Sequence, residues 1–248
     1  MLKFGERLDD LHRDGFKIIQ HPDKFCFGMD AVLLADFAKV HRGQRALDLC
    51  AGNGIVSILM AARSPQDAAF NGIEIQPEMV CMANRSIQYN NLQDRVNITL
   101  GDIRRGDSTP PLGTVPVFDV VTANPPYMPV GDGKQSPNEA NALARHEIMC
   151  TLDDVVAAAS RHLVPKGRFY MVHRPARLAE IFASLAKHDM AAKALRLVQP
   201  KINQPPNLLL ISAIKGGNPG LVVDAPLIVY NKTGEYTEEV KRIYEVGL

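Results

Sequence analysis

The chain has almost no excess of either charge. Its 248 residues include 28 Lys and Arg against 27 Asp and Glu, which gives a formal net charge of +1. The molecule as a whole is therefore not a polycation, and any contact with nucleic acid must use a local basic patch. Hydrophobic residues (46%) and charged residues (22%) are as frequent as in ordinary globular proteins. The length suits one large α/β domain, or such a domain with small additions.

Long apolar stretches and paired cysteines are also missing. No uninterrupted apolar run reaches the roughly 18 residues that would cross a bilayer, and the N-terminal MLKFGERLDDLHRDG lacks the apolar segment of a signal peptide. The four cysteines lie far apart, at positions 26, 50, 81 and 150, and include no C-x-x-C pair. They indicate neither a zinc site nor a disulfide framework. We therefore expect a reduced, cytoplasmic protein that uses no metal and no membrane.

From Arg45 onward, short apolar strands alternate with helical segments. Strands are expected at 46–50, 69–75, 96–100, 117–123, 168–173, 194–199 and 208–214, and helices at 54–63, 77–91, 152–163 and 175–189. This alternation predicts an α/β, Rossmann-like fold with a mostly parallel seven-stranded sheet and helices on both faces. The last two strands follow one another without a helix, so the last strand should run antiparallel.

The two ends of the chain should add to this sheet. In residues 1–44 we expect a hairpin of 16–20 with 25–28 and a helix over 30–40, with Asp30 as its N-cap. Residues 45–248 form the main domain, and the first 44 should pack on it in one globular unit. Residues 221–230 are expected to add an edge strand.

A glycine-containing turn, 48-DLCAGNGI-55, follows the first strand of the main domain. In such sheets, ligands bind beyond the carboxyl ends of the strands. Gly52 and Gly54 let the backbone turn sharply and approach a ligand, which meets free N–H groups at the start of the next helix. Alone, this G-x-G is equally consistent with a tight strand-to-helix turn.

Acidic residues at successive strand ends favour a ligand site here. Asp48 lies at the end of the first strand, Glu74 ends the second about 20 residues after Gly54, and Asp102 follows the third. The second position suits a carboxylate that binds ribose hydroxyls. The third glycine of a G-x-G-x-x-G dinucleotide motif is missing, and several carboxylates suit a ligand with positive charge better than one with phosphates. S-adenosylmethionine, with a sulfonium and an ammonium group, fits these features.

The motifs DLCAGNG, GIEI, GDI and NPPY, in this order, resemble the class I S-adenosylmethionine-dependent methyltransferases that methylate planar nitrogens. The wider pattern, with FCFGMDAVLLADF, ARHE and NQPPNLLL, resembles the bacterial tRNA1(Val) (adenine-37-N6)-methyltransferase family over nearly the whole chain. The resemblance implies an S-adenosylmethionine cofactor and a tRNA partner. It also implies a cofactor pocket lined by Asp48, Ala51, Gly52, Asn53, Gly54, Glu74, Ile75, Asp102, Ile103 and Asn124. Because the family varies at Cys50 and Asn53, only their backbone role is carried over.

The fourth strand ends at Asn124-Pro125-Pro126-Tyr127, which we interpret as the catalytic motif. An exocyclic amine is a poor nucleophile, and acceptors aimed at its two hydrogens favour the geometry that transfer needs. Asn124 supplies a side-chain oxygen and Pro125 a backbone carbonyl, while Pro126 has no N–H and keeps the backbone extended. Tyr127 can stack on the base. Asn-Pro and Pro-Pro are also ordinary turn signals, but here they follow the glycine turn and acidic strand ends.

The substrate side is predicted from a long loop and from cations. Residues 128–147 show no clear helix or strand, and such long loops are usually functional or disordered. If the later strands run parallel to the first four, a positive rim forms beside the motif from Arg145, His146, Arg174, Arg177 and Lys201. His173, directly before Arg174, is counted with these cations. Each residue taken singly is more often a solvated surface charge, and the prediction rests on their convergence at one edge.

Two other functions remain open from the sequence. A protein-glutamine N5-methyltransferase would share NPPY, because a glutamine amide offers the same planar NH2. Members of that class resemble a catalytic domain preceded by a separate helical domain, whereas about 44 residues precede the cofactor motif here. A non-catalytic RNA-binding module that keeps the fold is the second alternative, and the intact Asn124, Tyr127 and glycine turn argue against it.

Overall fold

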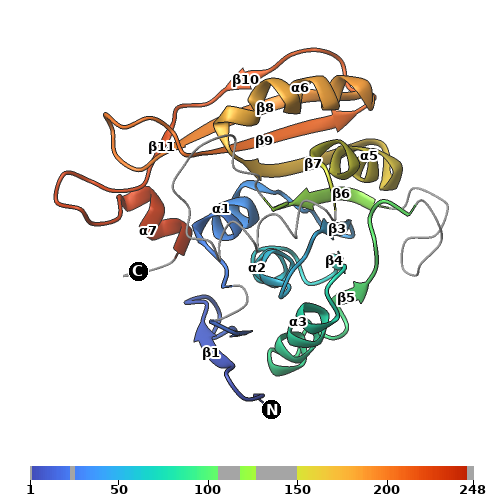
Figure 1. Cartoon of the computed structure of the whole chain (residues 1–248), viewed down its shortest axis with the longest axis vertical. Coiled ribbons are helices and arrows are strands. Elements are labelled where there is room, and N and C mark those ends of the chain that lie inside the picture. The colour runs from blue at the N-terminus through green and yellow to red at the C-terminus, as the bar shows by residue number, and fades with distance from the viewer. Residues whose placement is uncertain (1, 23–25, 106–117, 127–149, 245–248) are drawn as a thin grey trace.

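The computed structural model describes residues 2–22, 26–105, 118–126 and 150–244. Its centre is one mixed sheet with the strand order β10-β8-β9-β7-β6-β3-β4-β5 and with β11 beside β8 (Figure 1). Seven longer strands form its body: β3 (Arg45–Leu49), β4 (Ala69–Glu74), β5 (Val96–Leu100), β6 (Phe118–Ala123), β7 (Leu163–His173), β8 (Met190–Gln199) and β9 (Leu208–Lys215). Strands β5, β4, β3, β6 and β7 run parallel, and β9 is antiparallel to both β7 and β8. The predicted sheet and its antiparallel last strand are confirmed.

The direction of β8 matters for function. Because β9 is antiparallel to both of its neighbours, β8 runs in the same direction as β7 and β6. The carboxyl ends of β3, β4, β5, β6, β7 and β8 therefore lie along one edge of the sheet. In α/β sheets of this kind, ligand sites form at that edge.

Helices cover both faces of the sheet. They are α1 (Met29–Phe37), α2 (Ile55–Arg63), α3 (Pro77–Tyr89), α5 (Leu152–His162), α6 (Leu178–Lys187) and α7 (Glu238–Tyr244), with a 3-10 turn at Pro175–Arg177. Helices α1, α2, α3 and α7 pack in one apolar core, and α5 and α6 in the other. Alternate strand residues supply the two cores, for example Val120 to the first and Val121 to the second. This is the period-2 pattern of strands buried on both faces.

Local sequence explains several helix starts. Pro77 stands in the first turn of α3, where its missing N–H leaves no bond unmade. Thr151 and Asp154 form a reciprocal capping box at the start of α5, in which Thr151 Oγ1 accepts from the Asp154 N–H at 3.2 Å. The predicted N-cap of α1 is wrong. Gly28 holds that position in extended geometry, and Asp30 lies in the first turn with Oδ1 accepting from the Ala31 N–H.

The N-terminal hairpin differs from the prediction. Its strands are β1 (Arg7–Asp10) and β2 (Lys17–Gln20), paired antiparallel. Of the partner strand predicted at 25–28, residues 26–28 form no strand, and residue 25 lies outside the described residues. The hairpin packs through Leu8 and Ile19 on Met79 and Met82 of α3. Figure 1 shows it beside α3, with the C-terminal α7 next to α1.

Polar contacts also tie this segment to the main domain. Both carboxylate oxygens of Glu6 accept from the Arg85 guanidinium at 2.6 Å, and the Ile19 N–H donates to Ser86 Oγ at 2.9 Å.

At the opposite end of the chain, the expected edge strand is present as two short pieces, β10 (Val222–Val223) and β11 (Leu227–Ile228), both parallel to β8.

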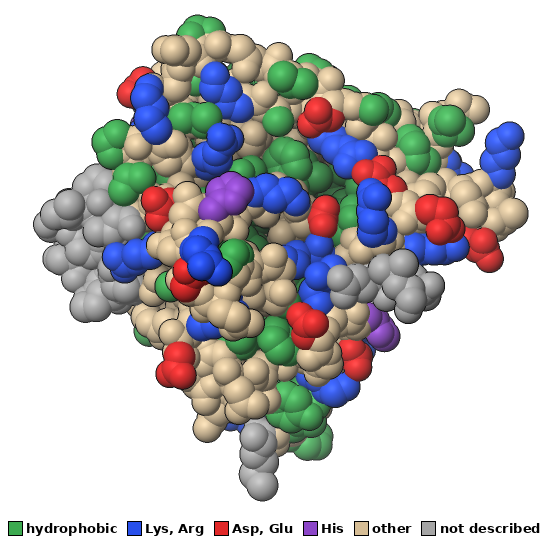
Figure 2. Space-filling model, turned by 180° about the vertical axis from the view of Figure 1, so that it is seen from behind, with side chains coloured by type: hydrophobic (Ala, Val, Ile, Leu, Met, Phe, Trp, Pro, Cys, Tyr) green, Lys and Arg blue, Asp and Glu red, His purple; other side chains and the backbone are tan. Residues whose placement is uncertain are grey.

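The charge of the surface is mixed. On the face drawn in Figure 2, Lys and Arg side chains are interspersed with Asp and Glu. Within the described part of the chain, no helix is long and apolar enough to cross a membrane. In the same residues, no group of three or more His, Cys, Asp or Glu side chains could hold a metal ion.

Candidate active site

The turn between β3 and α2 has the backbone of a tight ligand-binding loop. Cys50, Gly52 and Gly54 all have left-handed geometry, with φ of 58°, 55° and 82°. Gly54 is the N-cap of α2, and a Cβ there would stand 3.2 Å from the Cβ of Ala83. Position 54 therefore needs glycine for both its conformation and its packing. The turn brings the start of α2 to the ligand edge of the sheet.

A carboxylate is held against this turn. Glu74, the last residue of β4, accepts the Gly52 N–H through Oε2 at 2.9 Å and the Gln76 N–H through Oε1 at 2.9 Å. Its side chain is buried. A negative group on the amide of the glycine turn disfavours a phosphate at the same place, because like charges repel. The turn therefore fits a ligand that carries hydroxyls and positive charge.

Asp48 lies behind the turn rather than at its surface. Its carboxylate is buried and accepts hydrogen bonds from Thr122 Oγ1 at 2.8 Å and Ser57 Oγ at 3.3 Å. Burial raises the pKa of Asp48 to about 7, although these two hydrogen bonds oppose the shift. Ser57 stands where a dinucleotide motif would carry its third glycine, and its hydroxyl is used to hold Asp48. The loss of that glycine thus has a structural reason.

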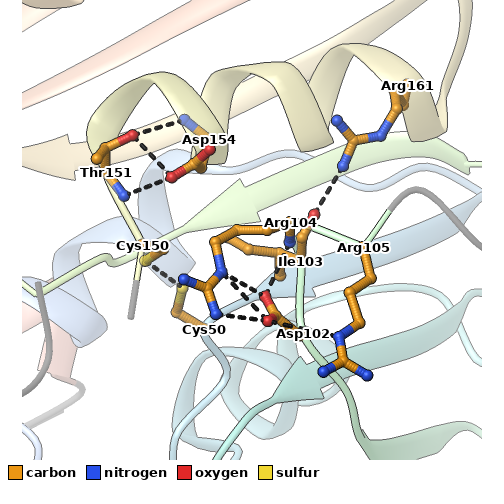
Figure 3. Close-up of polar contacts among 9 residues, drawn as sticks. All are labelled: Cys50, Asp102, Ile103, Arg104, Arg105, Cys150, Thr151, Asp154 and Arg161. Carbon is orange, nitrogen blue, oxygen red and sulfur yellow. Dashed lines mark hydrogen bonds and ion pairs between the residues drawn. The ribbon is translucent and has the colours of Figure 1, made fainter. Parts of the chain in front are cut away.

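Asp102 and Ile103 follow β5, and Ile103 contacts Arg161 of α5 (Figure 3). The Arg104 guanidinium donates to the Asp102 carboxylate, at 2.7 Å between Nη2 and Oδ2, and this contact lowers the pKa of Asp102. Asp102 is still largely buried, with 12% of its side chain exposed. The carbonyl of Ile103 accepts from Arg161 Nη2 of α5 at 2.6 Å. Asp102, a carboxylate predicted for the pocket, is therefore ion-paired with Arg104. The spacing of the sequence motifs could not identify this partner.

The remaining residues predicted for the pocket also lie at this edge. Ala51 is buried, with its N–H bonded to the Ile73 carbonyl at 3.0 Å. Asn53 is fully buried and donates through Nδ2 to the Ile19 carbonyl of the hairpin at 3.3 Å. Ile75 follows Glu74 and is partly exposed, whereas Ile103 is buried. The hairpin thus contacts the glycine turn, a link that sequence spacing did not indicate.

The proposed catalytic motif leaves the sheet beside the glycine turn. In the parallel pairing of β3 and β6, Ala123 is opposite Leu49, so Asn124 and Cys50 leave neighbouring strands at the same level. Asn124 and Pro126 are partly exposed and Pro125 is buried. Tyr127 lies outside the described residues. The described part of the motif stands where its side chains and carbonyls can face a ligand on the turn.

Part of the predicted positive rim also lies along this edge. Arg174 follows β7 and Lys201 follows β8, and both are exposed. Arg174 Nη1 donates to the Asn207 carbonyl at 3.1 Å, which places it against the loop that carries Lys201. Arg177 forms an ion pair with Glu180 at 2.6 Å. Arg145 and His146 lie outside the described residues.

His173, which precedes Arg174, is buried, and burial lowers its pKa to about 4. It is therefore neutral near pH 7 and adds no charge to the rim.

Comparison with known proteins identifies relatives of the whole arrangement. Residues 16–194 match the family described as methyltransferase small domain. A tRNA1(Val) (adenine(37)-N6)-methyltransferase of Aeromonas hydrophila is 27% identical over 85% of each chain. Among solved structures, a predicted O-methyltransferase from Agrobacterium tumefaciens is 25% identical, with a TM-score of 0.70 over 88% of this chain and 96% of that one.

A more distant structure shares the fold alone. It is the geranyl diphosphate C-methyltransferase from Streptomyces coelicolor in complex with S-adenosyl-L-homocysteine, which is 13% identical with a TM-score of 0.56. The similarity covers 75% of each chain.

Proposed function

The chain belongs to the methyltransferase small domain family, and from this premise we propose that it methylates N6 of an adenine in tRNA. The cofactor is S-adenosylmethionine, and the target is adenosine 37 of tRNA1(Val). The Aeromonas hydrophila relative, matched over 85% of each chain, carries this activity in its name. Such an enzyme works in the cytoplasm, where tRNA is modified.

The chemistry of the turn supports this cofactor. When bound, S-adenosylmethionine supplies an electrophilic methyl group. Glu74 accepts from ribose hydroxyls in this proposal, and its carboxylate at the Gly52 amide disfavours the phosphates of a dinucleotide. Asp102 adds a second carboxylate at the next strand end, and releasing it from Arg104 would free acceptor oxygens for a ligand amine. Asp48 supports the turn from inside through Thr122 and Ser57.

The observation that carries the reaction type is the place of Asn124. It leaves β6 level with the glycine turn of β3, so its amide oxygen and the Pro125 carbonyl can both accept from one NH2 group near the methyl donor. These contacts strengthen as positive charge develops on nitrogen, which stabilises the transition state more than the substrate. The Asn124 amide does not accept a proton near neutral pH. The proton therefore leaves to water after transfer.

The rim supports an RNA substrate. Arg174 and Lys201 stand beyond the carboxyl ends of β7 and β8, on the edge that carries Asn124, while the whole chain stays near neutral. Phosphate contacts of this kind position RNA without reading sequence. A base in a tRNA loop is already partly unstacked, so its extrusion costs less than flipping from a duplex.

The experiment uses three acceptors with labelled S-adenosylmethionine. They are a tRNA1(Val) transcript, the same transcript with guanosine at position 37, and a bacterial release factor. We expect N6-methyladenosine in the first RNA and no label in the other two. Label in the release factor alone would identify a protein-glutamine methyltransferase. Cofactor binding without label in any acceptor would favour a non-catalytic RNA-binding module.

A further inference from the structure

Two cysteines that are 100 residues apart in the chain meet at the cofactor turn. Cys50 Sγ and Cys150 Sγ are 4.0 Å apart, one within the glycine turn and the other directly before the N-cap of α5 (Figure 3). Both residues are partly exposed, and the Cys150 thiol is the less buried of the two, so a small oxidant meets it first. Neither thiol has a role in the methyl transfer proposed above.

Cys50 occupies a backbone position that is unfavourable for its side chain. Its φ of 58° lies in the left-handed region, which glycine adopts without cost and other residues rarely do. Strained conformations of this kind gather at functional sites. Because of this geometry, the Cys50 side chain points toward the start of α5.

We propose that Cys50 and Cys150 form an oxidisable thiol pair whose disulfide shuts the cofactor turn. The oxidant is a peroxide. The Cys150 thiolate attacks one peroxide oxygen and becomes a sulfenic acid, with one water released. The Cys50 thiol then displaces the hydroxyl from that sulfur, which forms the S–S bond, and its proton leaves with the hydroxide as a second water. In sum, two thiols and one hydrogen peroxide give one disulfide and two waters.

The groups around the two thiols shift their pKa values in opposite directions and so give them different roles in disulfide formation. The hydrogen bond between them lowers the pKa of Cys150 and raises that of Cys50. The Arg104 guanidinium further favours the Cys150 thiolate. Cys150 is therefore the attacking thiol and Cys50 the resolving one.

We expect closure of the bond to move the turn. A disulfide holds its sulfurs about 2 Å apart, so the pair has to approach by about half of its present separation. Thr151 and Asp154 cap α5 directly after Cys150, and the Ala51 N–H is fixed to the Ile73 carbonyl. The displacement therefore falls on Cys50, two residues before the Gly52 amide that contacts Glu74. This rests on the proposal that the turn binds S-adenosylmethionine.

The test uses a Cys26→Ser/Cys81→Ser background, in which only the pair can react. After hydrogen peroxide and alkylation, a non-reducing peptide map should show the Cys50–Cys150 cross-link. The affinity for S-adenosylmethionine, measured by calorimetry, should fall at least tenfold and return with dithiothreitol. Adding Cys150→Ser should leave the affinity unchanged by peroxide. Cys50→Gly, which suits the left-handed backbone, should also prevent the cross-link.

In the wild-type chain, Cys81 serves as an internal standard for the dose of hydrogen peroxide. Cys81 has a pKa lowered by a hydrogen bond from Lys3, and no other cysteine in the described residues lies within bonding distance of it. Absence of the cross-link at a dose that oxidises Cys81 would overturn the proposal. A cross-linked protein whose affinity falls less than tenfold would overturn it too. Reduced protein that fails to bind S-adenosylmethionine would refute the cofactor assignment instead, since the peptide map decides the thiol pair by itself.

Discussion

The backbone N–H of Gly52 donates to Oε2 of Glu74 at 2.9 Å, so the glycine turn after β3 and the end of β4 form one polar unit. The same carboxylate accepts from the Gln76 N–H through its other oxygen. Two backbone donors thus hold Glu74 in one orientation. A ligand on the turn meets a fixed acceptor rather than a mobile side chain.

Replacing Glu74 should therefore weaken cofactor binding. Glu74→Ala removes a carboxylate acceptor, and hydrogen bonds to charged groups contribute about 1.5–3 kcal/mol. We expect the affinity for S-adenosylmethionine to fall about 10- to 100-fold by calorimetry. Glu74→Gln keeps one oxygen acceptor and should lose less. Unchanged affinity in the alanine variant would remove Glu74 from the pocket.

Replacing Asn124 should slow the methyl-transfer step and leave cofactor binding nearly unchanged. Asn124→Ala removes an acceptor that acts on the developing positive charge, and losing one preorganised contact of this kind costs about 100- to 1,000-fold in kcat. Affinity for S-adenosylmethionine should stay within a few fold. Single-turnover methylation of the tRNA transcript, with calorimetry in parallel, separates the two effects. Full activity in this variant would refute the role of the motif.

The sequence was sufficient for the sheet, because continuous apolar strands and short connections leave few arrangements. It was not sufficient for the hairpin. FCFG looks more strand-like than RLDD, yet RLDD pairs with β2 because Leu8 and Ile19 together cover Met79 and Met82 of α3. Tertiary packing outweighed local propensity.

The site was predictable in outline for a similar reason. Motif positions place Gly52, Glu74 and Asn124 at one edge, since the ends of parallel strands meet there. The neighbours of each group come from distant segments. Thr122, 74 residues from Asp48, donates a hydrogen bond to that buried carboxylate. Periodicity and spacing carry no information on such contacts.

The rim predicts a salt-sensitive effect on RNA binding. Arg174→Ala and Lys201→Ala should each weaken tRNA binding for all sequences alike and reduce the slope of log K against log salt by about 0.7–0.9. The affinity for S-adenosylmethionine should not change. Arg42→Ala is the matched control, because Arg42 is 86% exposed but precedes β3 at the opposite edge. Equal losses in all three variants would show that the rim is not the RNA surface.

The contact between Glu6 and Arg85 tests whether residues 1–44 fold with the main domain. The side-chain hydrogen bonds from Arg85 lower the pKa of Glu6 to about 2. Because the folded value lies below the unfolded one, the pair stabilises the fold above about pH 4.5 and loses this effect as the pH falls toward 2. Glu6→Gln should cost about 1.5–3 kcal/mol at pH 7 in urea unfolding, with a single transition.

The exposed Glu238–Lys241 pair provides the control for this measurement. Glu238 is 89% exposed in its side chain, so Glu238→Gln should change stability by less than about 0.5 kcal/mol. Two separate transitions in the wild-type chain would show that the N-terminal segment is an independent unit.

Asp48 should make the protein less stable as the pH rises, the reverse of an ordinary carboxylate. Its folded pKa of about 7 lies above the unfolded value of 3.8, so the folded chain holds a proton that the unfolded chain has lost between these values. Its contribution to stability is therefore retained below about pH 4 and falls as the pH rises to 7, by at most about 4 kcal/mol.

Asp48→Asn keeps an oxygen that accepts from Thr122 and carries no charge. Urea unfolding should show equal stability of variant and wild type near pH 4 and a more stable variant at pH 8. The exposed Asp67→Asn should show no such divergence. A variant that is less stable than wild type at pH 8 would mean that the Thr122 and Ser57 hydroxyls outweigh burial and keep Asp48 ionised.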